Sequence, residues 1–417
     1  MADIKPFKAY RPVEDKASEI ASLPYDVFNR KEAYEKVQKN PHTFLAIDRP
    51  ETQFAEDYDM YSDEVYKKAH DMLREQIDKG LFVQDEKPCY YIYEQTMNGR
   101  TQTGIVALSS IDDYLNNVIK KHENTRQEKE EDRIKHVYYC EAQTGPIFLC
   151  YRNNRLLTEL ISKVKEVDEP VYDFTSEDGV RNRIFVISDL EETETICRIF
   201  TTIDSIYIAD GHHRCASAVK VGLKKREENK GKVRGKLESD YFLSVLFSDD
   251  ELMIMDYNRV IKDLNGYTPD EFIEKISEKF DIKEEETAVK PEKKGEFGMF
   301  LENKWYRINA HEDILKSDPV EGLDVSVLQN EVLTPILGIG DPRTDKRIDF
   351  VGGIRGLSEL EKRCNTDMKL AFSMHPTSIS ELFEVADKGL LMPPKSTWFE
   401  PKLLSGLFIH TINGTII

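Results

Sequence analysis

The sequence contains few cysteines and no closely spaced cysteine pair. The six cysteines stand at positions 89, 140, 150, 197, 215 and 364, so no two of them form a Cys-x-x-Cys motif. A zinc ribbon or a redox-active dithiol needs such a motif. The spacing therefore excludes both kinds of site and predicts reduced, mostly buried thiols, as is usual in the cytoplasm.

Long apolar runs and positive charge are scarce as well. The chain has no run of about 18 apolar residues, and its first residues, MADIKPFKAYRP, lack the apolar core of a secretion signal. The 58 Lys and Arg are outnumbered by 77 Asp and Glu, which leaves a net charge of −19. A surface this acidic repels the phosphates of nucleic acids. We therefore expect a cytoplasmic protein whose partners include neither a membrane nor a nucleic acid.

The composition is that of a folded protein with more than one domain. Hydrophobic residues make up 40% of the 417 residues and aromatic residues 10%, which is enough for buried cores. A chain of this length is expected to form two or three domains. Helix-like and strand-like segments follow one another in mixed order, without an internal repeat. This order predicts an α/β (α+β) fold built around a mixed sheet.

Several segments carry clear signals of local structure. Apolar residues at helical intervals predict a helix over 56–80, and residues 155–167 are predicted to be helical too. The dipeptide Asn98-Gly99 between two strand-like runs predicts a hairpin. The other expected elements are strands at 138–151 (bent at Gly145-Pro146), 183–189, 206–209 and 241–250, and a helix at 324–336.

The strongest functional signal is a polar turn between a strand and a helix. An apolar run ends at Asp210-Gly211-His212-His213-Arg214, and small residues then open a helix. A helix N-terminus presents unpaired backbone N–H groups and the positive end of its dipole. Gly211 allows close approach of the backbone, and Arg214 supplies a fork for two oxygens. The turn therefore suits an anion, above all a nucleotide phosphate.

Two other interpretations of this turn compete with anion binding. Asp before Gly is also an ordinary turn, and an adjacent His pair can be a solvated helix start. A metal site is disfavoured, because His212 and His213 point about 100° apart on a helix and cannot chelate one ion together. We therefore predict no metal-binding cluster here.

Three further segments hold residues able to do chemistry. KHENTRQEKEEDRIKH at 121–136 contains His122, Glu123 and Arg133, which could supply a base, a magnesium ligand and a phosphate clamp. The competing interpretation is a solvated charged helix. Asp26, in LPYDVFNR, could act as a base or ligand, or only satisfy its own turn.

The third segment is MPPKSTWFEPKLLSG at 392–406. Lys395, Ser396 and Thr397 place one cation beside two hydroxyls, as at the chemical end of a phosphate loop. The glycine-rich turn of a Walker motif is missing, so the segment is not a P-loop. The alternative is a rigid surface loop with its aromatic residues packed inward.

Taken together, these segments resemble a known superfamily. The turn at 210–214 is similar to the signature of the ParB/sulfiredoxin-like superfamily, and the whole chain resembles a bacterial and archaeal family of unknown function with a ParB-like core. Six segments follow the family pattern in order: PYDV at 24–27, HENT with DR at 122–133, DGHHR at 210–214, MDYNRV at 255–260, LDVSVLQ at 323–329 and MPPKSTWFEPK at 392–402. The resemblance implies an N-terminal α/β segment (1–135), a ParB-like core (136–262) and a C-terminal α/β segment (263–417).

The resemblance also implies an activity. The turn is more similar to that of the superfamily's free-serine kinases than to that of sulfiredoxin, because Cys215 follows Arg214 whereas the sulfiredoxin cysteine precedes the His-Arg pair. The implied function is a nucleotide-dependent phosphotransferase that acts on a small hydroxylated metabolite such as free L-serine, with ATP or ADP as donor and Mg²⁺. The alternative is a regulatory protein that binds a nucleotide without turnover.

Roles follow for the candidate residues under this resemblance. Glu123, His213 and Asp26 are the catalytic candidates, with a carboxylate orienting or deprotonating the substrate hydroxyl. The phosphate-binding candidates are Asp210, Gly211, His212, His213, Arg214, Lys395, Ser396, Thr397, His122 and Arg133.

Overall fold

A computed structural model describes residues 1–233 and 235–416 and divides the chain into two units. Unit 1 comprises Met1–Lys120, Thr125–Leu252 and Pro401–Ile417, and unit 2 comprises Lys121–Asn124 and Met253–Glu400. The division into three segments suggested by the sequence stays a prediction. In the described part of the chain, each helix is too short or too polar to span a bilayer.

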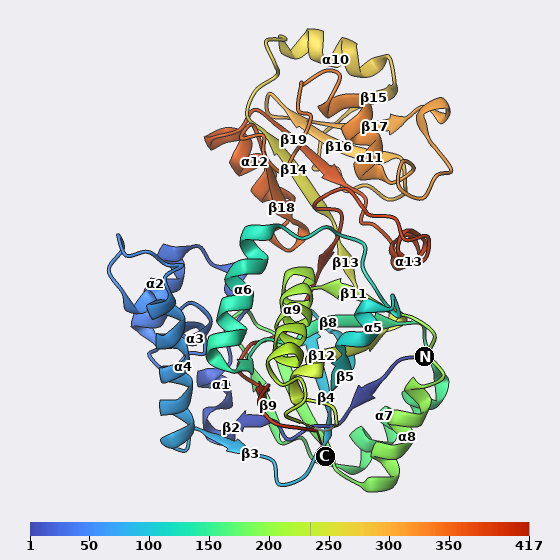
Figure 1. Ribbon diagram of the computed structural model, residues 1–417. Helices are drawn as coiled ribbons and strands as arrows, with labels where there is room; N and C mark the ends of the chain where they lie inside the picture. Colours follow the sequence, from blue (N-terminus) through green and yellow to red (C-terminus); the bar gives the residue numbers. More distant parts are fainter. Residues whose placement is uncertain (234, 417) are drawn as a thin grey trace. The chain divides into compact units, whose positions relative to one another are not determined.

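Unit 1 is built on a nine-stranded mixed sheet (Figure 1). The strands lie in the order β6-β11-β8-β12-β5-β4-β10-β9, and β1 pairs with β5. The β6–β11 and β8–β12 pairs are parallel and the others antiparallel. The bounds are β1 Ile4–Lys5, β4 Tyr90–Met97, β5 Arg100–Ser110, β6 Ile119–Lys120, β8 Ile147–Tyr151, β9 Tyr172–Thr175, β10 Arg181–Ile187, β11 Ile206–Asp210 and β12 Tyr241–Ser248.

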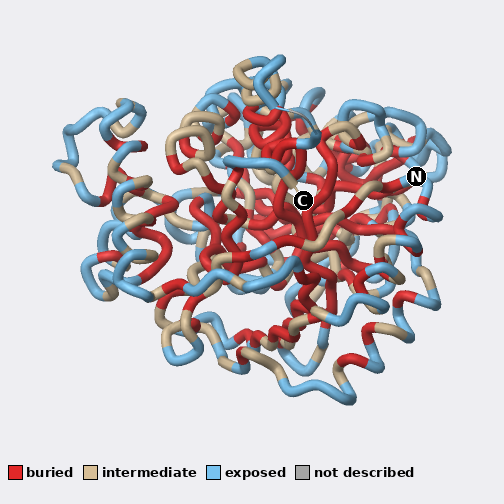
Figure 2. Tube along the Cα trace, turned by 60° about the horizontal axis from the view of Figure 1, so that its bottom comes forward, coloured by how far each residue is buried: buried red, intermediate tan, exposed pale blue. Residues whose placement is uncertain are grey.

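Helices and two short strand pairs complete unit 1. The helices α6 and α9 pack against each other (Figure 1). The strands β5, β8 and β12 are buried along nearly their whole length, and Figure 2 shows buried residues gathered in the interior of the fold. The helices are α1 Ala17–Ile20, α2 Arg30–Lys39, α3 Leu45–Asp48, α4 Asp63–Asp78, α5 Ile111–Leu115, α6 Gln127–Cys140, α7 Arg155–Val167, α8 Leu190–Phe200 and α9 His212–Glu228. The short pairs are β2 Tyr10–Pro12 with β3 Phe82–Gln84, and β7 Ala142–Gln143 with β21 His410–Thr411.

Unit 2 is built on an antiparallel six-stranded sheet in the order β15-β17-β16-β19-β14-β18. Its strands are β14 Tyr257–Ile261, β15 Phe280–Glu285, β16 Glu296–Leu301, β17 Lys304–Ala310, β18 Ile348–Gly352 and β19 Leu370–Met374. Its helices are α10 Pro269–Ser277, α11 Asp324–Leu328, α12 Leu357–Thr366 and α13 Ile379–Asp387. A separate pair joins β13 Ile254–Met255 to β20 Trp398–Phe399. The mixed α/β fold class predicted from the sequence is confirmed.

Two local predictions are confirmed, each with a visible cause. Asn98 and Gly99 adopt φ 51° and 80°, the left-handed pair that a two-residue hairpin needs, and they join β4 to β5. Helix α7 spans Arg155–Val167 because the Asn154 side chain caps its first amides and Leu157, Ile161 and Val164 bury one face.

Three other predictions are wrong at their boundaries. The helix expected from 56 begins at Asp63, because the Asp59 side chain accepts from the Tyr61 amide and holds a turn there. Residues 138–140 end helix α6 instead of starting a strand, since the Tyr138 ring packs under Lys224 at 3.6 Å. The helix expected over 324–336 is α11 followed by a π-helical turn, Gln329–Leu333.

Candidate functional site

The turn at 210–214 has the geometry that its sequence predicts. Strand β11 ends at Asp210, Gly211 adopts φ 91°, and α9 begins at His212. A Cβ on Gly211 would lie 3.1–3.3 Å from the Arg214 guanidinium. Position 211 therefore requires glycine both for its left-handed backbone and for the space it leaves to Arg214. As the N-cap residue, it has no side chain to cover the first amides of α9.

Asp210 is fixed in its ionised form by the C-terminal segment. Its Oδ2 accepts from Lys402 Nζ at 2.9 Å, and its Oδ1 accepts from the Gly211 amide at 2.7 Å. Burial by itself would raise the pKa of Asp210, but Lys402, Arg214 and these hydrogen bonds lower it far below its usual range. Gln95 Nε2 in turn donates to the Lys402 carbonyl at 3.0 Å. Asp210 is therefore a structural anchor of the turn, with its charge already compensated.

Arg214 is oriented by a backbone carbonyl. Its Nη1 donates to the Pro146 carbonyl at 2.8 Å, and the same atom would lie 3.6 Å from a Cβ on Gly145. Among the described residues, no carboxylate forms an ion pair with this guanidinium. Arg214 is half-buried, so it keeps a positive charge next to two glycine backbones. This is the arrangement that an incoming anion can use.

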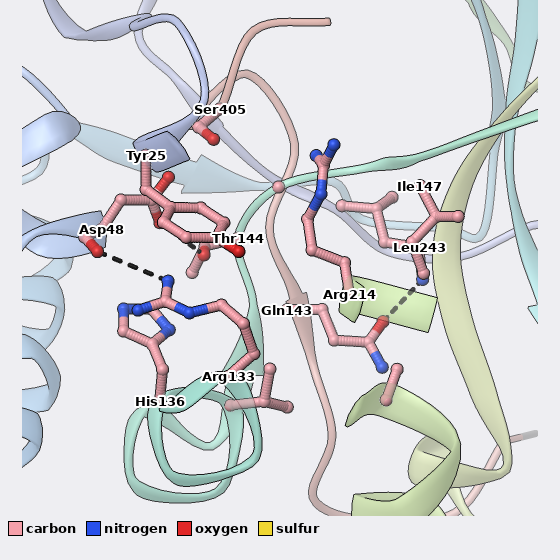
Figure 3. Close-up of a pocket in the computed structure, with 13 residues that line it drawn as sticks. Tyr25, Asp48, Arg133, His136, Gln143, Thr144, Ile147, Arg214, Leu243 and Ser405 are labelled. Carbon is pink, nitrogen blue, oxygen red and sulfur yellow. Dashed lines mark hydrogen bonds between the residues drawn. The ribbon is translucent and has the colours of Figure 1, made fainter. Parts of the chain in front are cut away.

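A small pocket joins Arg214 of α9 to Arg133 of α6 (Figure 3). The pocket has a volume of about 30 Å³, room for one or two water molecules. Figure 3 shows the Tyr25 ring lying against the Arg133 guanidinium and Ser405 close to the end of Arg214. The polar lining residues are Tyr25, Asp48, Arg133, His136, Gln143, Thr144, Arg214 and Ser405.

Arg133, unlike Arg214, has a carboxylate partner inside the protein. Its Nη2 lies 2.8 Å from Asp132 Oδ2, and its guanidinium lies 4.0 Å from the centre of the Tyr25 ring. Burial alone would lower the pKa of Arg133, but Asp132, Tyr25 and Asp48 raise it overall. Arg133 therefore lines the pocket with its charge already compensated by Asp132.

Two histidines near the pocket are held as neutral rings. His136 Nε2 donates to the Ile47 carbonyl at 2.9 Å, and burial together with the Arg133 charge lowers the pKa of His136. His213 Nε2 accepts from the Arg126 amide at 2.9 Å. Burial lowers the pKa of His213 despite the opposing charges of Glu130 and Asp26. His213 can accept a proton at Nε2 only after the Arg126 amide has moved away.

The other predicted residues divide between the two units. In unit 1, Asp26 follows Tyr25 in a short 3₁₀ helix, is exposed, and acts electrostatically on His213. In unit 2, the His122 carbonyl accepts from the Met392 amide at 2.8 Å, so the segment of His122 and Glu123 lies beside the loop that leads to Lys395.

The loop at 395–397 is held from within unit 2. Ser396 Oγ donates to the Pro393 carbonyl at 2.6 Å, and Thr377 Oγ1 donates to the Ser396 carbonyl at 2.9 Å. Lys395 is exposed, with φ 61°, while Thr397 is half-buried. The structure thus gathers Asp26, Arg133 and the turn at 210–214 in unit 1, and His122, Glu123 and the loop at 395–397 in unit 2. The joint use of both sets by one ligand stays a prediction.

Sequence reasoning missed uncharged members of the pocket. Thr144, Gly145 and Ser405 lie on connecting segments and carry no charge, and although Ser405 ends the segment at 392–406, none of the three was a predicted site residue. The expected bend at Gly145-Pro146 was a usable signal, because that bend brings the Pro146 carbonyl to Arg214.

Comparisons with known proteins give weak structural likenesses and one family match. A free serine kinase in complex with AMP is 15% identical, with a TM-score of 0.38, and the alignment covers 74% of this chain and 91% of that one. A conserved hypothetical protein from Pyrococcus furiosus is 17% identical, with a TM-score of 0.34 and coverage of 72% and 94%. SbnI from Staphylococcus aureus, with a C-terminal truncation, is 11% identical, with a TM-score of 0.37 and coverage of 72% and 85%.

With scores this low, function has to be inferred from the residues of this chain. No curated protein matches the sequence. The model of one family, described as "Protein of unknown function (DUF1015)", matches residues 4–326 of the 417, well over half of the sequence. The chain therefore belongs to the DUF1015 family.

Proposed function

We propose that this protein is a nucleotide-dependent phosphotransferase that acts on a small hydroxylated metabolite, with free L-serine as the first candidate acceptor and ATP or ADP as the donor. The turn at 210–214 in unit 1 holds phosphate groups of the nucleotide. The proposal follows from the resemblance of the six sequence segments to the ParB/sulfiredoxin-like superfamily and from the geometry of this turn.

One observation carries the proposal: Arg214 lies over Gly211 at the N-terminus of α9 without a carboxylate partner among the described residues. A 17-residue helix directs its positive end toward this point. The neighbouring acid, Asp210, is compensated by Lys402 and does not cancel the charge of Arg214 by an ion pair. A phosphate would therefore meet helix amides and a guanidinium together, which is the usual chemistry of phosphate binding.

The remaining residues have roles that phosphoryl transfer requires. Transfer breaks the bond between the terminal phosphorus and its bridging oxygen and forms a bond to the acceptor hydroxyl oxygen, while the hydroxyl proton passes to a base. Asp26, which is exposed near His213, and Glu123 are the proposed acceptors of that proton. Lys395, Ser396 and Thr397 are proposed to stabilise the transferred group, since positioning and neutralisation of charge supply most of the catalysis.

In this proposal, Mg²⁺ binds together with the nucleotide and not at a separate protein site. Among residues 1–233 and 235–416, no group of three or more His, Cys, Asp or Glu side chains could hold a metal ion. Mg²⁺ usually binds through substrate phosphates and one or two carboxylates, and the exposed Asp26 is the carboxylate that we propose for it in unit 1. When bound, Mg²⁺ would neutralise phosphate charge.

The binding half of the proposal is tested on Arg214. We expect Arg214→Ala to weaken ADP binding about 10- to 100-fold, because one charge-assisted hydrogen-bonding group is lost. Isothermal titration calorimetry measures the affinity, and circular dichroism checks that the fold is kept. The matched control is Arg155→Ala on α7, which removes an exposed arginine paired with Glu159 and should leave the affinity unchanged. Equal affinities for the parent and Arg214→Ala would refute the role of the turn.

The catalytic half is tested by product formation. Purified protein is incubated with ATP or ADP, Mg²⁺ and L-serine, and mass spectrometry detects phosphoserine. We expect product with the parent and Arg155→Ala, and a strong reduction with Arg214→Ala. Nucleotide binding without product across a panel of hydroxylated metabolites would contradict the kinase proposal and favour a nucleotide-binding regulator.

A further inference from the structure

Unit 2 contains an arginine buried in the middle of its sheet. Arg259 lies on β14, opposite Phe350 of β18 and Phe372 of β19, and its exposed fraction is 4%. Its neighbour Val260 belongs to the apolar core that includes Leu360 of α12. Because neighbouring side chains on a strand point to opposite faces, Arg259 lies on the face away from that core.

The hydrogen bonds of Arg259 do not balance its charge. Nη1 donates to the Tyr257 carbonyl, and Nη2 donates to the Lys395 carbonyl at 3.0 Å. Throughout residues 1–233 and 235–416, no carboxylate forms an ion pair with this guanidinium. Burial lowers the pKa of Arg259 to about 10, so the group stays protonated at neutral pH. A buried cation satisfied only by neutral carbonyls is a costly feature for a sheet to carry.

A second cation and an aromatic cluster adjoin Arg259. Lys395 Nζ lies 5.4 Å from the centre of the Tyr257 ring, and the Arg259 guanidinium lies 5.4 Å from that of Phe350. Tyr257 packs edge-on against Phe350 and Trp398, at 5.8 Å and 4.9 Å. Lys395 is exposed, and Phe350 and Trp398 are half-buried, so the cluster reaches the surface of unit 2.

Three acidic residues that lie close to the cluster in sequence have other partners. Asp256 Oδ2 accepts from Asn258 Nδ2 at 2.5 Å, and Glu400 Oε1 accepts from Trp398 Nε1 at 2.8 Å. Asp349 pairs with Arg363 at 2.9 Å. Two cations thus adjoin one aromatic cluster, and in the described part of the chain neither forms an ion pair with a carboxylate. Like charges brought together in this way are stabilised by an anion.

We propose that Arg259 and Lys395 form an oxyanion-binding site within unit 2, for a phosphate or carboxylate group of a small molecule. The proposal shares Lys395 with the phosphotransferase proposed above, but it does not rest on nucleotide binding at the turn of unit 1. The guanidinium has donors beyond the two that its carbonyl contacts use, and an oxyanion accepts such donors in pairs. The backbone contact to the Lys395 carbonyl holds the loop in place over β14.

The test measures anion affinity with the unit 1 contact removed. In the Arg214→Ala background of the full chain, inorganic phosphate and acetate are titrated separately by calorimetry, so that phosphate and carboxylate are distinguished. We expect one of them to bind, and Arg259→Met to weaken that binding about 10- to 100-fold. Lys395→Asn, which suits the left-handed backbone at 395, should weaken it less. The control Arg343→Met, on an exposed ion pair with Asp341 in the same unit, should leave it unchanged.

A stability measurement separates anion binding from a purely structural role. In anion-free buffer, removal of an uncompensated buried charge should leave the urea midpoint of Arg259→Met equal to or above that of its background. A lower urea midpoint together with unchanged anion affinity would show that Arg259 has only a structural role in holding the loop at 395–397. This result would overturn the proposal. If Arg259→Met does not fold, Arg259→Gln replaces it, because glutamine keeps a hydrogen-bond donor without the charge. Its anion affinity and urea midpoint are then compared in the same way. Absence of nucleotide binding to the parent would refute the unit 1 proposal and leave these titrations unaffected.

Discussion

Two buried arginines, one in each unit, differ in how their charges are compensated. In unit 1, the buried Arg133 pairs with Asp132 at 2.8 Å, and Asp210 pairs with Lys402 at 2.9 Å. In unit 2, the buried Arg259 has two carbonyl partners and no carboxylate partner in the described part of the chain. Burial accordingly lowers the pKa of Arg259, whereas the acids around Arg133 raise the pKa of that residue.

Unit 2 contains a second buried group of this kind, Asp324 at the start of α11. Its Oδ1 accepts from the Gly295 amide at 2.9 Å, while Oδ2 has no hydrogen-bond partner among the described residues. Burial raises the pKa of Asp324 to about 7, against the weaker effects of the Gly295 amide and Lys294, and Glu381 adds to the increase.

The difference indicates what each set of charges does. A buried ion pair within the chain is part of the scaffold, and its two members depend on each other. A buried group without an opposite charge gains stability from outside the chain, by binding an ion or by exchanging a proton with solvent. In our proposals, the internal pair of Arg133 supports the pocket of unit 1 and Arg214 binds the ligand, whereas Arg259 and Asp324 of unit 2 have no opposite charge paired with them among the described residues.

The largest expected loss of stability comes from breaking the ion pair between Asp132 and Arg133 in unit 1. Asp132→Asn keeps the acceptor for the Tyr66 hydroxyl but removes the charge that balances Arg133. We expect the free energy of unfolding to fall by about 3–5 kcal/mol, because a buried guanidinium is left uncompensated. Urea unfolding followed by circular dichroism measures the loss.

A surface pair provides the control for this prediction. Asp173→Asn opens the exposed pair with Arg181 and should cost about 0–1 kcal/mol. If Asp132→Asn cost no more than this control, the distinction between internal pairs in unit 1 and uncompensated groups in unit 2 would be lost.

The second largest expected effect is a pH dependence of the free energy of unfolding, caused by Asp324 of unit 2. The folded pKa of Asp324, about 7, lies above the usual aspartate value of 3.8, so the folded state binds the proton more tightly than the unfolded state. The stability that the protonated carboxyl contributes is complete below about pH 4 and is lost as the pH rises through 7. Between pH 5 and 8 the parent should therefore lose about 2 kcal/mol relative to Asp324→Asn, which does not titrate.

Urea unfolding at pH 5, 6, 7 and 8 measures this difference. The control is Glu286→Gln, which removes an exposed carboxylate in the same unit and should differ from the parent by the same amount at each pH. A constant difference between the parent and Asp324→Asn would mean that Asp324 ionises normally in the folded protein.

The sequence allowed the local elements to be predicted, but not the partners of the charges. The strand, Gly211 and the helix at 206–222 were visible, because backbone conformation there depends on neighbouring residues. The pairing of Lys402 with Asp210 joins residues 192 positions apart, and only the fold brings them together. Arg133 has its partner Asp132 next to it in the sequence, but that both lie in the interior follows only from the fold. Nothing in the sequence marks Arg259 as a buried arginine without a carboxylate partner among the described residues.

The smallest expected loss of stability comes from a substitution at Gly211, which also tests the role of the turn in ADP binding. Gly211→Ala should lower the free energy of unfolding by about 1–2 kcal/mol, because alanine is strained at φ 91°. The new Cβ would also lie 3.1–3.3 Å from the Arg214 guanidinium and displace it, so ADP affinity measured by calorimetry should fall. Gly179→Ala is the matched control, since Gly179 has φ 82° and no described atom within 4 Å of its Cβ position. It should lose similar stability and keep its ADP affinity. Equal affinities in the two variants would show that Arg214 does not hold the phosphate from its place over the turn.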